Sequence, residues 1–195
     1  MPRHTYTNMS KELKVKGGVL LVAEPFMTDG FFNRTVVLIC EHNRRSSFGF
    51  VLNKRLDMTI NELVEDFPDF DCPIYCGGPV QNDNLYFLHT LGDIIPDSTE
   101  ISEGIFWGGD FNELRKLIDL RLITKNEVRF FVGYSGWDAD QLSQEMKDNS
   151  WVITEPQPNF VFTEKGDNDL WKFVLDNKGN TFSVIARIPN GLSWN

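Results

Sequence analysis

The sequence predicts an α+β domain in which a mixed β-sheet is flanked by about four helices. Short apolar strands come first along the chain and helices alternate with strands later, an order typical of a mixed sheet. Four helix starts are marked by residues that can cap a first turn. The chain has 195 residues, of which 41% are hydrophobic and 24% charged, and these values fit one globular domain.

The early strands are marked by apolar runs between turn residues. Residues 19–23 lie between two glycines and a proline, and residues 35–40 are β-branched and apolar throughout. An unbroken apolar run predicts a strand that is covered on both faces. Residues 48–52 follow a polar segment, so they are expected to pair with residues 35–40 in a hairpin whose loop has about five residues. Further strands are predicted at 74–76, 85–89, 104–107, 128–132, 151–154 and 181–185.

Helix starts are predicted from capping side chains. Thr59 and Glu62 form a capping-box pattern, because the hydroxyl can accept from the third helical amide while the carboxylate reaches back to the cap amide. Pro68 is expected to end this helix. The same reasoning predicts helices that begin at Asp110, at 138–141 and at Asp167, the last of which ends near Gly179.

The bulk properties predict a cytoplasmic protein without a membrane segment. Residues 1–16 are expected to form a flexible tail and residues 17–195 a single domain. No apolar run has the length of a signal sequence or a membrane span. Cys40, Cys72 and Cys76 make an odd number of thiols, which is typical of a reducing compartment.

The net charge of −9 argues against direct binding of nucleic acid, because such proteins show a basic face. The charge is uneven, however. Residues 1–60 carry nine basic against five acidic residues, a net charge of +4, and the rest of the chain is strongly acidic. The basic part holds a set of four side chains that are interpreted as solvated surface or as a contact for an anion or nucleic acid: Arg44, Arg45, Lys54 and Arg55.

No spacing in the sequence predicts a catalytic site. Motifs for nucleotide binding and for zinc proteases are absent. The segment Gly133-Tyr134-Ser135-Gly136-Trp137 resembles a nucleophile elbow, but its second glycine comes one residue early. It is interpreted instead as a structural turn whose glycines allow a positive φ.

Candidate zinc ligands occur at unfavourable spacings. Cys40 and His42 are two residues apart and Cys72 and Cys76 are four apart, whereas zinc sites favour closer cysteine pairs. We therefore expect no metal and no cofactor, and we expect the thiols to be buried or half-buried.

His42 and His89 lie near predicted strand ends, where binding residues are common. Acid–base catalysis would need a partner carboxylate. Glu41 is the nearest in sequence, but neighbouring residues of a strand point to opposite faces. Each histidine is therefore interpreted first as hydrogen-bonded scaffold, and an enzyme of unrecognised mechanism that uses His42 or His89 is the alternative function.

Five sequence blocks resemble those of the YqgE/AlgH family, and they occur in the family's order. They are N-R-T-V-V-L-I-C-E-H-N from Asn33, G-x-V-L-N-K from Gly49, G-G-P-V from Gly77, L-H-T from Leu88, and G-Y-x-G-W…Q-L-x-x-E from Gly133. The resemblance implies a bacterial cytosolic protein with a bent, forked sheet that closes into a pseudo-barrel. It implies no reaction, although members are often labelled transcriptional regulators.

The resemblance also selects residues that are polar, aromatic or glycine but form no catalytic set. We expect them to line one groove, and the alternative is that they are scaffold: Asn53, Gly77, Gly78, Pro79, His89, Tyr134, Trp137 and Gln141. Tyrosine and tryptophan offer flat contact area with a polar tip. The predicted function is a non-catalytic binding or regulatory domain whose partner is an unknown protein or small molecule.

Overall fold

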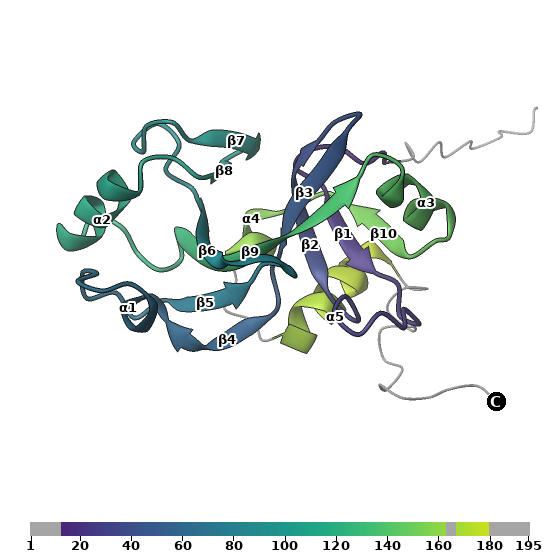
Figure 1. Cartoon of the computed structure of the whole chain (residues 1–195), viewed down its shortest axis with the longest axis horizontal. Helices are drawn as coiled ribbons and strands as arrows, with labels where there is room; N and C mark the ends of the chain where they lie inside the picture. Colours follow the sequence, from purple (N-terminus) through teal and green to yellow (C-terminus); the bar gives the residue numbers. More distant parts are fainter. Residues whose placement is uncertain (1–12, 163–166, 180–195) are drawn as a thin grey trace, which may run out of the picture.

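Figure 1 shows a computed structural model of the chain, which describes residues 13–162 and 167–179. The strands in these ranges are β1 (Leu20–Ala23), β2 (Val36–His42), β3 (Ser46–Val51), β4 (Arg55–Thr59), β5 (Pro73–Cys76), β6 (Val80–His89), β7 (Thr99–Ser102), β8 (Ile105–Trp107), β9 (Val128–Asp138) and β10 (Trp151–Thr154). The helices are α1 (Ile60–Leu63), α2 (Phe111–Asp119), α3 (Gln141–Lys147), α4 (Pro158–Val161) and α5 (Asp167–Lys178). This is the predicted α+β class.

The strands form one large sheet, most of it antiparallel. Its main path runs β10-β1-β2-β3-β9-β6-β8-β7, with β5 beside β9 and β4 beside β5. The β5–β9 pair is parallel, so the prediction of a mixed sheet is confirmed. The predicted hairpin of β2 and β3 is also present, but its loop has only residues 43–45 because both strands are longer than predicted.

The sheet forks at β9, which changes partners along its length. Its first half pairs with β5 and β6, and residues 135–138 pair with β3. Gly133, with a φ of 68°, lies next to the change of partner, because Tyr134 still pairs with β6 and Ser135 pairs with β3. The interpretation of residues 133–137 as a turn was wrong, because they continue the strand.

The predicted closure into a pseudo-barrel is not found. From β9, the strands β6, β8 and β7 extend toward one side of the molecule, and β3, β2, β1 and β10 extend toward the other (Figure 1). β10 and β7 stand at opposite ends of the path and do not pair with each other. The sheet is therefore bent and forked but open.

The strands β1 and β2 are covered on both faces, as their apolar runs predicted. Leu38 belongs to a buried cluster with Trp171 of α5, and the Trp171 indole N–H donates to the Ala23 carbonyl at 2.8 Å. The next residue, Ile39, faces the opposite cluster, which contains Trp137. In the other half of the molecule, α1 and α2 pack on the β4–β6 region around fully buried residues such as Phe130.

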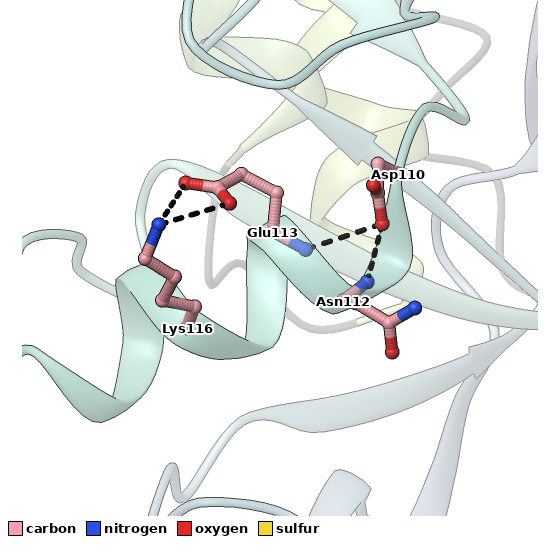
Figure 2. Close-up of polar contacts among 4 residues, drawn as sticks. All are labelled: Asp110, Asn112, Glu113 and Lys116. Carbon is pink, nitrogen blue, oxygen red and sulfur yellow. Dashed lines mark hydrogen bonds and ion pairs between the residues drawn. The ribbon is translucent and has the colours of Figure 1, made fainter.

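The cap of α2 is the clearest match to a local sequence signal. One carboxylate oxygen of Asp110 accepts from the backbone N–H groups of Asn112 at 2.8 Å and Glu113 at 3.2 Å (Figure 2). Glu113 does not reach back to the cap. It pairs instead with Lys116 at 3.2 Å, one turn further along. The helix start is confirmed with half of the expected capping box.

The first helix is shorter than predicted. Glu62 accepts from the Thr59 backbone N–H at 2.7 Å, as expected of a capping box. The helix nevertheless ends at Leu63, because Val64 is already extended with a φ of −112°, and it does not continue to Pro68. At α3, the N-cap Asp140 makes no side-chain cap bond, and only Gln141 reaches back, to the Asp138 N–H at 3.4 Å.

Several elements were missed or fall outside the described ranges. β4, β7 and α4 were not predicted. Residues 1–12 of the predicted tail and the predicted strand at 181–185 lie outside the described residues. Leu13 and Val15, which also belong to the predicted tail, pack against the cluster that contains Trp137. Within residues 13–162 and 167–179, no helix has the length and apolar character needed to span a membrane.

Candidate binding groove

An aromatic groove lies where β3, β6, β8 and the second half of β9 meet. Its volume is about 530 Å³. Five rings from these strands line it: Phe48, Tyr86, Trp107, Tyr134 and Trp137. Phe48, Tyr86, Trp107 and Tyr134 are half-buried, and Trp137 is only 3% exposed. A hollow of this size with rings on its surface has the dimensions of a small-molecule site.

The rings meet at steep angles. Phe48 and Trp107 have centroids 4.9 Å apart and planes at 74°. Tyr134 stands at 82° to Phe48 and at 80° to Tyr86. Edge-to-face contacts of this kind are favourable because the positive edge of one ring meets the negative face of the next. They hold the groove in shape without a ligand.

The rest of the groove is polar or small. The other lining residues are Ser46, Ser47, Val80, Gly136, Asp138 and Gln141. Ser47 is 4% exposed, and its hydroxyl lies 2.7 Å from Nδ1 of His42, its cross-strand neighbour in the β2–β3 hairpin. A hydroxyl–imidazole contact therefore lies at the edge of the cavity.

Glu145 of α3 fixes one end of the groove. Its Oε2 accepts from the indole N–H of Trp137 at 2.9 Å and of Trp151 at 2.7 Å. Its Oε1 accepts from the Gln141 side chain at 3.0 Å. The Q-L-x-x-E spacing is thus explained by geometry, since residues four apart on a helix lie on one face. It orients Trp137 and Gln141 toward the groove.

Gly77 and Gly78 hold the fork of the sheet and do not line the groove. A Cβ on Gly78 would lie 2.1 Å from the Tyr134 backbone, and one on Gly77 would lie 2.4 Å from the Gly133 carbonyl oxygen. The Gly77 carbonyl accepts from the Val51 N–H at 2.8 Å and from the Ser135 hydroxyl at 3.0 Å. Only glycine permits this approach of three backbones.

Of the eight residues expected in one groove, Tyr134, Trp137 and Gln141 line it. Asn53 is elsewhere and buried, where its amide accepts from the Val36 N–H and donates to the Arg34 carbonyl, each at 2.8 Å. Pro79 is exposed beside the lining residue Val80. The predicted set thus divides into groove residues and scaffold.

The AlgH-like family model matches residues 20–183. This protein belongs to the AlgH-like family. It is 41% identical to a UPF0301 protein of Chlorobaculum parvum over 175 residues, and this match covers 90% of this chain and 93% of that protein. It is 40% identical over 174 residues to a UPF0301 protein of Parabacteroides distasonis, with coverage of 88% and 87%.

Two solved structures share the fold. The solution structure of AlgH from Pseudomonas aeruginosa has a TM-score of 0.70 and 26% identity, and the match covers 97% of this chain and 99% of that one. A crystal structure of a Corynebacterium diphtheriae protein has a TM-score of 0.76 with coverage of 90% and 94%, and at 20% identity it supports the fold alone. The predicted family is confirmed, and the matches specify no activity.

His89 of this AlgH-like chain is fully buried scaffold. Its Nδ1 accepts from the Leu91 N–H at 3.1 Å, so the proton of the neutral ring lies on Nε2, which is 3.0 Å from the Gly108 carbonyl oxygen. Burial lowers the pKa of His89, and the bond to Gly108 opposes this shift. The Phe106 ring stacks on the imidazole at 5.8 Å. Both ring nitrogens are occupied within the core.

The four basic residues do not gather in one place. Arg44 and Arg45 form the exposed tip of the β2–β3 hairpin, where the Asn43 side chain accepts from the Arg45 backbone N–H at 2.8 Å. Lys54 and Arg55 follow the far end of β3. Lys54 lies over the Phe31 ring at 4.1 Å. Six residues of extended strand separate the two pairs.

The thiols are placed as structural residues. Cys40 is 7% exposed, and burial raises its pKa well above the usual value. Cys72 is 2% exposed and Cys76 is half-buried. Among residues 13–162 and 167–179, no group of three or more His, Cys, Asp or Glu side chains could hold a metal ion.

Sequence reasoning missed much of the groove. Phe48, Tyr86 and Trp107 come from three strands whose positions depend on long-range pairing. A usable signal was present in residues 47–50, where Phe48 and Phe50 alternate with the small residues Ser47 and Gly49. It indicates that Phe48 points away from the face that holds them. Nothing in the sequence placed Trp107 beside it.

Proposed function

We propose that this AlgH-like protein is a non-catalytic binding or regulatory domain that holds a small ligand in the aromatic groove. The observation that carries the proposal is a preformed cavity of about 530 Å³ lined by five rings, four of them half-buried. Aromatic rings that are left in contact with solvent are unfavourable because of their large apolar area, and such rings commonly line ligand sites. The polar residues at one end, Ser46, Asp138 and Gln141, would orient the ligand.

The test uses indole, a neutral aromatic probe, added to the full chain and followed by amide NMR. We expect the largest shifts at Gly136 and at the Trp107 indole. The Trp107→Leu variant should bind indole more weakly. Phe26→Leu is the matched control, because Phe26 is an aromatic residue that is 50% exposed and does not line the groove. Shifts spread over the whole surface, or equal losses in both variants, would contradict the proposal.

A second candidate function is an enzyme that uses His42, and the Ser47–His42 contact of 2.7 Å favours it. The Ser47 oxygen would attack the carbonyl carbon of an ester while Nδ1 of His42 takes the hydroxyl proton. That proton would leave with the alcohol, and water would then release the acid and restore Ser47. His89 offers no comparable geometry, because its ring nitrogens are engaged in the core.

Hydrolysis of a p-nitrophenyl ester tests the enzyme. The Ser47→Ala variant should lose the activity, and the exposed Ser143→Ala variant should keep it. An activity that survives Ser47→Ala, or a wild-type rate equal to that of buffer, rejects this candidate and leaves the binding function in place.

A further inference from the structure

We propose that the ligand of the aromatic groove is a small organic cation with an alkylated ammonium head, held by the rings and balanced by Asp138. This inference rests on the proposed binding function and narrows it to one chemical class. It is argued from the arrangement of the rings and from the charges around the groove.

The rings that line the groove stand at steep angles to one another. Tyr134 stands nearly perpendicular to both Phe48 and Tyr86, and Trp107 stands at 74° to Phe48. Rings that meet at such angles can present faces to a shared space, and each face carries negative electrostatic potential. Alkylammonium ions are attracted to these faces, most strongly to tryptophan and tyrosine. Four of the five lining rings are of these two types.

The charges favour a cation over an anion. Asp138 is exposed and is the charged residue in the lining, and no lysine or arginine lines the groove among the residues the structure describes. Arg44 and Arg45 lie at the neighbouring hairpin tip and are exposed to solvent. An anionic ligand would face Asp138 without a compensating contact in the lining, whereas a cation would pair with it.

The groove also offers little to a strongly hydrated ion. Apart from Asp138 and the rings, its side chains supply hydroxyl groups at Ser46 and Ser47 and an amide at Gln141. A primary ammonium or a metal ion would lose more hydration than these groups replace. A quaternary ammonium group has no N–H donors to satisfy and loses less. The geometry therefore suits a methylated head with a short polar tail.

The experiment compares choline with its neutral isostere 3,3-dimethylbutan-1-ol, using the full chain and NMR titration. We expect choline to bind on the order of tenfold more tightly, since the two differ only in charge at the head. Choline binding should weaken several-fold in Asp138→Asn and as salt rises. Asp119→Asn is the matched control, because Asp119 is an exposed aspartate at the end of α2.

The outcomes separate this inference from the proposed function. Equal affinity for choline and the isostere, or an Asp138→Asn variant that binds choline as wild type does, overturns the cation assignment. If indole still binds in the groove, the binding function stands alone. If choline, the isostere and indole all fail to bind, both proposals are rejected. Trp107→Leu should also lose the preference for choline, and its circular dichroism spectrum checks that the variant is folded.

Discussion

Trp137 of β9 and Glu145 of α3 are joined by a hydrogen bond of 2.9 Å from the indole N–H to one carboxylate oxygen, and Trp151 of β10 donates to the same oxygen at 2.7 Å. One side chain thus connects a helix to two strands, β9 and β10, that are not neighbours in the open sheet. Both indoles are almost fully buried. An indole N–H can only donate, so truncation of Glu145 removes the acceptor of both indoles.

Replacing Glu145 with alanine should therefore lower the free energy of unfolding by about 2–4 kcal/mol, because two buried donors lose a charged acceptor. Urea unfolding followed by circular dichroism measures the change, and Glu145→Gln should cost less because one amide oxygen remains. Ser143→Ala, an exposed change on the same helix, should stay within about 0.5 kcal/mol of wild type. Equal stabilities for Glu145→Ala and Ser143→Ala would show that the shared acceptor contributes nothing.

Local signals in the sequence predicted the features that depend on neighbouring residues. Asp110 caps α2 as expected, because a carboxylate at the cap reaches amides only two and three residues away. The strand 55–59 was missed although Leu56 and Met58 alternate with charged residues, because Thr59 was interpreted only as a helix cap. Its partner is β5, and this pairing has no local marker.

The fork and the groove were harder to predict from the sequence, because they also depend on long-range pairing. Gly133 and Gly136 suggested a turn, whereas the positive φ of Gly133 lets β9 change partners while it continues as a strand. Whether that bend closes a barrel depends on where β7 and β10 lie, which is a property of the whole sheet. The family blocks supplied Tyr134, Trp137 and Gln141, and the ring contributed by β8 appeared only in three dimensions.

Gly78→Ala should destabilise the protein by about 3 kcal/mol. The added Cβ would lie 2.1 Å from the backbone of Tyr134. The neighbouring Gly77 is hydrogen-bonded to Val51 and Val132, which restrains the segment, so the cost falls at the upper end for an overpacked site. Gly30→Ala is the matched control, because an added Cβ there meets nothing within 4 Å. Thermal unfolding of both variants makes the comparison. A Tm for Gly78→Ala equal to that of Gly30→Ala would mean that the connection between β5 and β6 is not held this closely against β9.

His89 should make stability depend on pH in a defined direction. Burial lowers its pKa in the folded protein from the ordinary value of 6.5, so the unfolded chain binds the proton first as the pH falls. The contribution of the neutral ring is therefore complete above about pH 6.5 and is lost progressively below it.

Urea unfolding at a series of pH values tests this behaviour in wild type and in His89→Gln, whose amide can still donate to Gly108. The carboxylates act equally in both proteins, so the difference between their curves isolates the histidine. We expect wild type to lose more stability than the variant between pH 6.5 and pH 5. Parallel curves over this range would contradict the assignment of a neutral, buried imidazole.

The three thiols should differ in their reactivity toward a thiol reagent such as Ellman's reagent. The thiolate is the reactive form, and burial raises the pKa of Cys40 well above its usual value. Cys72 is also buried, whereas Cys76 is half-buried and its sulfur lies 3.7 Å from the Gly78 carbonyl oxygen. We expect Cys76 to react first in the native protein.

The Cys76→Ser variant should lose this fast phase, and Cys40→Ser should retain it. Denaturant should make all three react alike, because unfolding removes the burial that distinguishes them. Three equal rates in the native protein would mean that the covered face of β2 opens readily to solvent.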